Sequence, residues 1–304
     1  MTHTHLIVFG LGYTGAAVAG EAVARGLRVT AVRRDPAAAP TPPGIAVVAL
    51  AQAAPALAHA THLLATAPPP GDGGEGEWVD PVLHVHAAAI AAAPRLRWLG
   101  YLSTTGVYGD RGGAWVDEAT PPAPGQERSR RRLAAEQAWE AFSDRRAVDI
   151  FRVAGIYGPG RSAFDDLRAG RARRLVKPGH AFGRIHRDDI VAAVLAAVAQ
   201  DVPPGVRILN LNDDEPAEPA LVVEEAARLL GIAPPPCVPF AEAEARMSPL
   251  ARSFWAESRR VGSAQTQAAL GLRWRYPTFR EGLRAILAEE AGHGPAEERQ
   301  IPRP

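Results

Sequence analysis

Three glycines near the start of the chain have the spacing of a phosphate-binding turn. Gly10, Gly12 and Gly15 read G-x-G-x-x-G. The apolar run 6–9 precedes them and an Ala- and Val-rich pattern at 16–25 follows, as a strand and a helix would. Gly10 allows the tight turn, Gly12 lets the backbone approach a pyrophosphate, and Gly15 lets the helix pack close to the strand. The N–H groups that open such a helix face the phosphates. The predicted dinucleotide-binding residues are therefore Gly10, Leu11, Gly12, Tyr13, Thr14 and Gly15.

The elements that position this turn alternate between strand and helix, which is typical of a parallel, doubly wound sheet. The fold class is therefore α/β, with a Rossmann-type doubly wound parallel sheet and a smaller C-terminal substrate lobe. The expected strands are 6–9, 27–32, 45–50, 62–65, 98–103, 148–153 and 207–211. The expected helices are 14–25, 78–93, 127–142, 187–199, 221–230 and 278–289.

The composition excludes several classes of protein. The 304 residues are 47% apolar and 22% charged, as in an ordinary globular chain. A net charge of +1 provides no field that would recruit nucleic acid or a membrane. No apolar run approaches the roughly 20 residues that span a bilayer, and the first apolar run is already a strand rather than a signal peptide. The single cysteine excludes an internal disulfide, and no compact set of metal ligands is present. We expect a cytoplasmic protein without a metal.

The end of the second strand sets the choice between nicotinamide cofactors. An acidic residue there bonds the adenosine 2′-hydroxyl of NAD, whereas arginine favours the 2′-phosphate of NADP. Arg33 and Arg34 come first, and Asp35 lies one step late. The order favours NADP over NAD. The alternative is that both arginines are ordinary solvated loop residues.

Five blocks of sequence, in order, resemble a known family. The chain resembles the NAD(P)-dependent epimerase/dehydratase family, the extended branch of the short-chain dehydrogenases/reductases, and within it an atypical subgroup whose glycine turn reads G-x-G-Y-T-G. The resemblance implies a dinucleotide-binding domain at 1–154 with a return segment at 187–212, and a substrate lobe at 155–186 and 213–290. It also leaves room for a homodimer. The matching blocks are 10–15, 103–109 (STTGVYG), 152–160 (RVAGIYGPG), 184–190 (RIHRDDI) and 209–216 (LNLNDDEP).

The chain departs from this family at the acid/base dyad. The resemblance implies a Tyr-x-x-x-Lys pair on the helix after the fifth strand. The Leu-Ala-Ala-Glu segment at 133–136 fixes the register, which puts Arg128 at the tyrosine position and Arg132 at the lysine position. Lys177 is the only lysine of the sequence, and the residue four before it is Arg173. The dyad is therefore absent.

The two arginines cannot simply replace the dyad. A guanidinium stays protonated, so Arg128 cannot exchange a proton near neutral pH. Arg132 keeps a positive charge and is predicted to bond ribose or phosphate oxygens. The pair shares one helix face, being four residues apart. Two interpretations remain: a solvated basic face, or an anion clamp in which Arg128 binds the substrate.

The resemblance assigns the remaining site residues. Thr104 occupies the family's Ser/Thr position, and its hydroxyl is predicted to bond a substrate oxygen. Tyr108 is the nearest phenol that could carry the proton, and packing in the Val-Tyr-Gly turn is the alternative. Tyr157 and Arg161 follow the sixth strand and are predicted substrate ligands, with a purely structural turn as the alternative. Ala65, at the end of the fourth strand, completes the predicted cofactor site.

Two segments lack helix and strand signals. The segment 68–77 is rich in Pro and Gly and follows the fourth strand, at the sheet edge where ligands bind. A mobile lid and a solvated loop are both compatible with it. The polar segment 291–304 is predicted to be a disordered tail.

Two functions remain for the chain. One is an NAD(P)-dependent oxidoreductase or an epimerase/dehydratase-like enzyme. Its expected substrate is a small hydroxylated or carbonyl compound, and nucleotide-sugar-like compounds are among the candidates. The other is a non-catalytic NAD(P)-binding sensor or regulatory protein, which the missing dyad favours. Fold alone does not decide between them.

Overall fold

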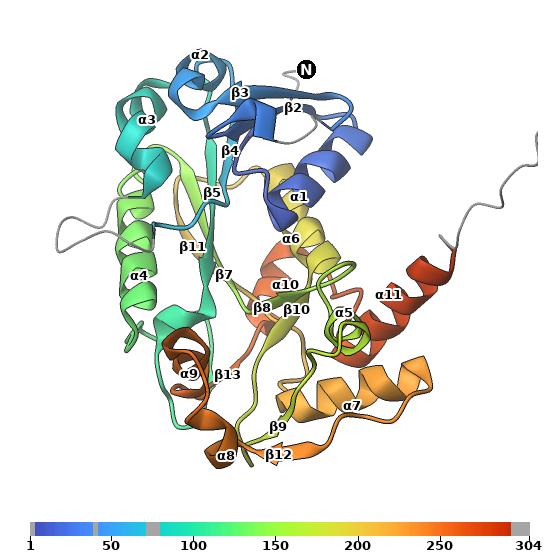
Figure 1. Ribbon diagram of the computed structural model, residues 1–304. Helices are drawn as coiled ribbons and strands as arrows, with labels where there is room; N and C mark the ends of the chain where they lie inside the picture. The colour runs from blue at the N-terminus through green and yellow to red at the C-terminus, as the bar shows by residue number, and fades with distance from the viewer. Residues whose placement is uncertain (1–3, 39–41, 71–79, 293–304) are drawn as a thin grey trace, which may run out of the picture.

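The computed structural model describes residues 4–38, 42–70 and 80–292. Within them, seven strands form one sheet in the order β11-β7-β5-β4-β1-β2-β3 (Figure 1). All neighbouring strands of this sheet run parallel. The strands are β1 (His5–Phe9), β2 (Arg28–Arg33), β3 (Ile45–Ala49), β4 (His62–Ala65), β5 (Trp98–Thr104), β7 (Ala147–Val153) and β11 (Gly205–Leu211).

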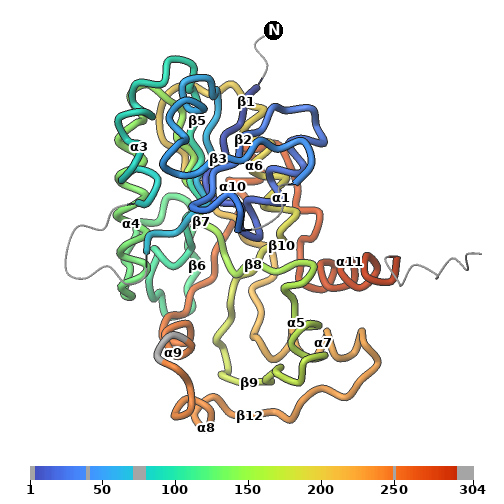
Figure 2. Tube along the Cα trace, turned by 45° about the horizontal axis from the view of Figure 1, so that its top comes forward, coloured from blue at the N-terminus to red at the C-terminus, as the bar shows by residue number. Residues whose placement is uncertain are grey.

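Helices cover both faces of the sheet, so its inner strands β7, β5, β4 and β1 are buried and mostly apolar. On one face α1, α6 and α10 enclose a core that includes Val18, Ile190 and Leu270. On the other face α2, α3 and α4 enclose a second core that includes Leu57, Ile90 and Trp139. Figures 1 and 2 show the two layers on opposite sides of the sheet. The helices are α1 (Tyr13–Ala24), α2 (Ala54–Leu57), α3 (Pro81–Ala92), α4 (Glu127–Glu140), α6 (Arg187–Ala199) and α10 (Ala264–Leu270).

The strand order reverses beside β1. β1 pairs with β2 on one side and with β4 on the other. After β1, the chain forms β2 and β3 on one side of β1. It then returns to add β4 and the later strands on the other side. In open α/β sheets, ligands bind in the crevice at such a switch point. The glycine turn 10–15 lies there.

The remaining elements form a smaller part below the sheet in Figure 1. Its strands pair in parallel twos: β8 with β10, β9 with β12, and β6 with β13. A third core, including Phe164, Phe279 and Ile286, lies between α5, α7 and α11. The elements are β6 (Trp115–Val116), β8 (Gly155–Tyr157), β9 (Arg174–Val176), β10 (Arg184–His186), β12 (Cys237–Pro239), β13 (Arg260–Val261), α5 (Ala163–Arg168), α7 (Pro219–Leu230), α8 (Phe240–Glu244), α9 (Pro249–Trp255) and α11 (Phe279–Gly292). Short 3₁₀ turns lie at η1 (Pro36–Ala38), η2 (Leu50–Gln52) and η3 (Thr105–Tyr108).

The predicted fold class is confirmed, with each predicted strand and helix present. The short elements β8, β9, α8 and α9 were not predicted, because tertiary contacts rather than periodicity define them. The division into two domains stays a prediction. In it, α10 was placed with the substrate lobe, yet Leu270 packs in the core beneath the sheet with α6.

Some predictions fall partly or wholly outside the described residues. The segment 68–77 is described only as far as Pro70, so the lid hypothesis lies outside the described part from residue 71 on. The helix expected from residue 78 begins at Pro81 in the described part, where the Asp80 side chain accepts hydrogen bonds from Val82 N and Leu83 N. α11 continues to Gly292, into the start of the predicted tail, and the rest of that tail is not described. Among the described helices, none is long and apolar enough to cross a membrane.

Candidate dinucleotide and substrate site

The glycine turn is shaped by two different steric demands. Gly10 has a φ of 103°, in the region that favours glycine. A methyl group at Gly15 would collide with the Gly10 carbonyl oxygen. A methyl group at Gly12, by contrast, would meet no described heavy atom within 4 Å, and its φ of −77° suits any residue. The fold therefore explains Gly10 and Gly15, but it does not explain why position 12 lacks a side chain.

Neighbouring strands hold this turn in place. Thr66, directly after β4, donates its hydroxyl to the carbonyl oxygens of Phe9 at 3.1 Å and Gly10 at 2.9 Å. Tyr13 donates its hydroxyl to the Pro159 carbonyl at 3.0 Å, which joins the start of α1 to the turn after β8. Gly12 is the N-cap of α1, and no side chain caps the first turn. Its opening N–H groups face the switch-point crevice without a side-chain competitor.

The predicted cofactor residues outside the turn lie at the same edge of the sheet. Arg33 ends β2, and Arg34 directly after it is exposed. The Asp35 carboxylate accepts a hydrogen bond from Ala37 N at 2.9 Å, so it caps its own 3₁₀ turn. Ala65 ends β4 opposite Phe9 and is fully buried. Arg33 and Arg34 therefore lie at the carboxyl end of β2, next to the carboxyl end of β1 where the glycine turn begins.

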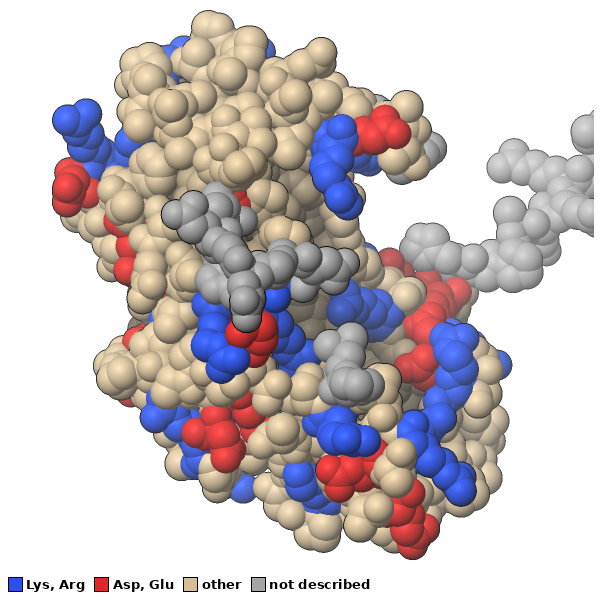
Figure 3. All heavy atoms as spheres, turned by 60° about the vertical axis from the view of Figure 1, so that its left-hand side comes forward, with Lys and Arg blue, Asp and Glu red and all other residues tan. Residues whose placement is uncertain are grey.

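A cavity of about 740 Å³ lies between the sheet edge and the smaller lobe. Its wall combines the ends of β5 and β7 with the start of α4 and with the segment around α9. Lys and Arg side chains gather around a hollow on this face of the molecule (Figure 3). Among the described residues that line the cavity, five are arginines and one is a glutamate: Arg128, Arg132, Arg161, Arg184, Arg259 and Glu257. The cavity is therefore suited to an anion.

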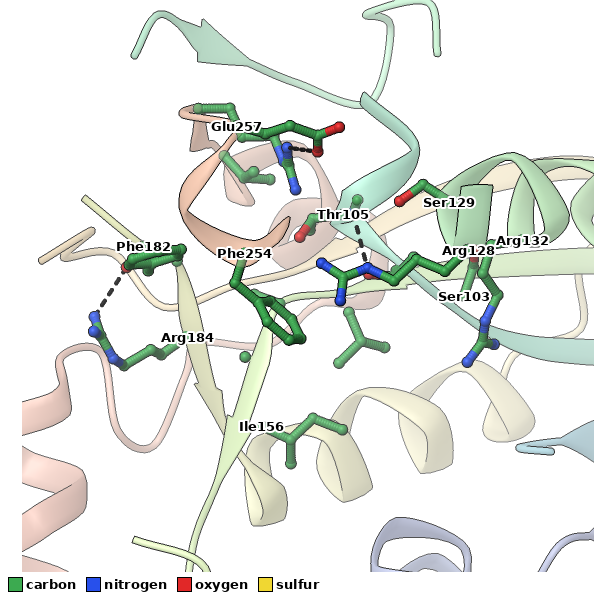
Figure 4. Close-up of a pocket in the computed structure, with 18 of the residues that line it drawn as sticks. Ser103, Thr105, Arg128, Ser129, Arg132, Ile156, Phe182, Arg184, Phe254 and Glu257 are labelled. Carbon is green, nitrogen blue, oxygen red and sulfur yellow. Dashed lines mark hydrogen bonds and ion pairs between the residues drawn. The ribbon is translucent and has the colours of Figure 1, made fainter. Parts of the chain in front are cut away.

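Arg128 and Arg132 both line this cavity, but they are held differently. The Arg128 guanidinium lies 3.8 Å from the ring centroid of Phe254 and makes no hydrogen bond to the described residues (Figure 4). Burial lowers the pKa of Arg128, and the nearby Glu257 opposes that shift. Arg132 instead donates from Nη1 to the Leu102 carbonyl at 2.6 Å and to the Tyr101 hydroxyl at 3.2 Å. Arg128 thus keeps all its donors for a ligand, and Arg132 is fixed against β5.

Four hydroxyls line the cavity where β5 ends, those of Ser103, Thr104, Thr105 and Ser129. Thr104 Oγ1 accepts a hydrogen bond from Gly106 N at 3.1 Å, which leaves its own proton for another acceptor. A methyl group at Gly106 would lie 2.8 Å from Ser129 Oγ and 3.4 Å from Thr104 Oγ1, so the two hydroxyls flank this glycine. Ser103 donates to Glu136 Oε1 at 2.5 Å. The Ser103 proton is therefore engaged, whereas the Thr104 proton remains available to a ligand.

Tyr108 lies behind the cavity and not in its wall. It is fully buried, donates its hydroxyl to Asn210 Oδ1 at 2.8 Å, and stacks on the Arg152 guanidinium at 4.7 Å. Arg152 in turn forms a buried ion pair with Glu136 at 2.8 Å. Burial raises the pKa of Tyr108. This placement favours the packing role of Tyr108 over the proton-carrier role.

Tyr157 and Arg161, both predicted substrate ligands, also differ in the cavities that they line. Tyr157 lines a second cavity of about 440 Å³, and its hydroxyl points to the Thr278 carbonyl at 3.5 Å. Arg161 lines both cavities, as does Arg184. The Arg161 guanidinium stacks 5.7 Å from the Tyr13 ring and makes no hydrogen bond to the described residues. Arg161 is therefore, like Arg128, a cation that lines the first cavity without a hydrogen-bond partner in the described part. Tyr157 lines the second cavity and not the first.

The His186 side chain caps α6, because it accepts a hydrogen bond from Asp188 N at 3.2 Å. Asp189 accepts from the backbone of Arg275 and Tyr276, at 2.7 and 3.1 Å. Burial lowers the pKa of His186 to about 4, so the ring is neutral and can accept.

Sequence reasoning missed the wall that comes from the C-terminal third. Phe254, Glu257, Arg259 and Arg184 line the cavity, and none was predicted. The only signal available was the placement of Arg184 in a block that matches the family. The segment 234–260 has no clear period, so its part in the site depends on long-range contacts.

Known proteins share this fold. No family model matches the chain. A structure of a functionally unknown conserved protein from Silicibacter pomeroyi DSS is 40% identical, covers 94% of this chain and 99% of its own, and superposes with a TM-score of 0.82. A putative NAD-dependent epimerase/dehydratase from Methylobacillus flagellatus is 25% identical, covers 96% and 100%, and gives a TM-score of 0.71. Among curated proteins, the 3-diazoavenalumate denitrifying reductase of a Streptomyces species is 29% identical over 304 residues, 91% of this chain and 98% of that protein.

The sheet order, the switch-point turn and these similarities define one class, the NAD(P)-binding proteins with a doubly wound α/β fold and an appended lobe. Within that class, the chain belongs to the NAD(P)-dependent epimerase/dehydratase family, the extended short-chain dehydrogenases/reductases.

Proposed function

We propose that this protein is an NADP-dependent oxidoreductase that acts on a small anionic carbonyl or hydroxyl compound. The observation that carries the proposal is Gly12. The fold demands a glycine at positions 10 and 15 but leaves position 12 open. A diphosphate that approaches the first turn of α1 explains the third glycine. The similarity to a reductase supports redox chemistry over a purely structural role.

The residues at the switch point fit a nicotinamide dinucleotide. The N–H groups that open α1 would hold the diphosphate. Arg33 and Arg34 would bind a 2′-phosphate, and the engagement of Asp35 with its own turn supports NADP over NAD. Arg132, fixed against β5, would bond ribose oxygens. A bound nicotinamide supplies or accepts a hydride.

The chain's own residues would select and orient the substrate. Arg128 and Arg161 present guanidinium groups without hydrogen bonds to the described residues, and a carboxylate or phosphate would satisfy them. Thr104 would donate its free proton to the substrate oxygen, which orients that atom at the end of β5. The exposed ring of Phe254, 52% accessible, offers an apolar surface beside the anion.

Two assays test this function in order. Calorimetry with NADP⁺ and NAD⁺ asks whether either dinucleotide binds. Oxidation of NADPH, followed by its fluorescence, is then measured against matched sets of anionic and neutral carbonyl compounds. Arg128→Ala should raise KM for anionic compounds about tenfold or more, since charged hydrogen bonds contribute roughly 1.5–3 kcal/mol each. Arg130→Ala is the matched control, because that side chain is 52% exposed and pairs with Glu127. Absence of dinucleotide binding would refute the proposal.

Two observations favour a second function, that of a non-catalytic NADP sensor. Position 128 carries a guanidinium instead of a phenol, and Tyr108 is shielded from the cavity by burial. A sensor binds the dinucleotide and an anion without oxidising either. Tight binding of NADPH with no turnover of any carbonyl in the panel would select this second function.

A further inference from the structure

Glu257 is the one acidic residue in the described wall of the arginine-rich cavity. Its side chain is 8% exposed. Oε2 pairs with Arg259 Nη1 at 2.9 Å, but Oε1 is buried and has no hydrogen-bond partner among the described residues. A methyl group at Gly125 would come within 2.9 Å of Oε1, so the backbone just before α4 lies close to this oxygen.

The backbone around Glu257 is held firmly. Ser258 N donates to Asp110 Oδ1 at 2.8 Å, and the Ser258 carbonyl accepts from Arg111 N at 2.9 Å and Gly113 N at 3.0 Å. β13 then pairs with β6. Arg259 Nη1 also donates to the Gly109 carbonyl at 2.7 Å. Glu257 is therefore fixed to the loop that follows Thr104 and η3, on the substrate side of the sheet.

This arrangement is costly unless a ligand completes it. A buried carboxylate oxygen without a donor has lost its hydration and gained no hydrogen bond in exchange. Arg128 stands in the same wall, and it too lacks a hydrogen bond to the described residues. Figure 4 places Glu257, Thr105 and Ser129 on one side of the Phe254 ring, with Arg128 beside that ring. The cavity thus offers a cation, an aromatic surface and an acceptor.

We infer that Glu257 is a substrate-selecting residue whose Oε1 accepts a hydrogen bond from a hydroxyl or amino group of the substrate. The substrate class is then an anion that also carries a hydrogen-bond donor, with its anionic group at Arg128 and its donor at Glu257. The inference rests on the anion-binding cavity of the proposed function and narrows its substrate class. A simple anion without a donor leaves Oε1 unsatisfied and binds more weakly.

The test uses benzoate as the anionic probe, together with hydroxybenzoates and aminomethylbenzoates substituted at each ring position. Calorimetry measures their affinities for the full-length protein with and without NADP⁺. In the wild type, at least one substituted probe should bind about tenfold tighter than benzoate, as a charged hydrogen bond implies. The hydroxyl and aminomethyl arms show which donor the site prefers.

Glu257→Gln should reduce this advantage to less than about threefold while benzoate itself binds as in the wild type. Glu242→Gln is the matched control, because Glu242 lies on the exposed side of α8 in the same segment and should change nothing. If Glu257→Gln does not fold, Glu257→Asp keeps the carboxylate and should retain part of the advantage.

Two results would overturn the inference: no advantage of any substituted probe in the wild type, or an undiminished advantage in the Glu257 variants. Absence of benzoate binding would overturn the anion site and this inference together. Absence of NADP⁺ binding with an intact donor preference would instead refute the proposed cofactor and leave the role of Glu257 standing.

Discussion

Gly12→Val should separate dinucleotide binding from folding. The new side chain meets no described atom within 4 Å at its Cβ, and the backbone at this position is extended. We therefore expect the free energy of unfolding to change by no more than about 1 kcal/mol. The same side chain would occupy the approach of the diphosphate to the first turn of α1. Loss of two charged hydrogen bonds, at roughly 1.5–3 kcal/mol each, corresponds to about a hundredfold to ten-thousandfold loss of affinity.

Two glycines of the same region provide the controls. A methyl group at Gly20, in the middle of α1, also meets no described atom within 4 Å, so Gly20→Ala should leave binding unchanged and stabilise the helix by up to about 1 kcal/mol. Gly15→Ala should instead destabilise the fold, because its methyl group would collide with the Gly10 carbonyl. Urea denaturation gives the stabilities, and calorimetry with NADP⁺ gives the affinities.

The reasoning fails if Gly12→Val binds the dinucleotide as the wild type does. It also fails if Gly12→Val lowers the free energy of unfolding as much as Gly15→Ala does, because the fold itself would then require a glycine at position 12.

Three further outcomes are expected. Replacing both Arg33 and Arg34 by alanine should weaken NADP⁺ by about tenfold or more and leave NAD⁺ unchanged in parallel titrations; an equal loss for both would identify the arginines as solvated bystanders. Burial raises the pKa of Asp213 to about 8. The unfolded chain ionises this group near pH 4 and the folded chain only near pH 8, so the free energy of unfolding falls as pH rises between these values. In the wild type this loss should amount to roughly 2–4 kcal/mol between about pH 5 and about pH 8. Asp213→Asn should remove the loss, as measured by urea denaturation across this pH range. Tyr108→Phe should leave kcat unchanged and cost about 1 kcal/mol of stability through the lost bond to Asn210, whereas a fall in kcat at equal dinucleotide affinity would restore Tyr108 as the proton carrier.

The parts of the site that depend on local pattern could be predicted from the sequence. The glycine spacing, followed by a helix, located the turn because its steric demands involve neighbours in the chain and one adjacent strand. The Leu-Ala-Ala-Glu register put Arg128 and Arg132 on one face of α4, and both line the cavity. Helical periodicity carries that information over a few turns.

The rest depends on contacts between distant segments. The surroundings of Tyr108 are set by Asn210 and Arg152, which the sheet brings together from β11 and β7. Phe254 and Glu257 reach the cavity through the pairing of two-residue strands, β13 with β6, that have no sequence signature of their own. No local pattern distinguishes this carboxylate from the exposed acidic residues of α8.

The pairing of β13 with β6 has a consequence for biosynthesis. Ser258 and Asp110, which it brings together, are 148 positions apart in the chain. Chains fold from the N-terminal side while the ribosome still extends them. The glycine turn and its supporting strands β1, β2 and β4 have left the ribosome long before Phe254 and Glu257 are added. A nascent chain therefore contains the segments that would bind a nucleotide well before it contains the cavity residues that would discriminate among substrates.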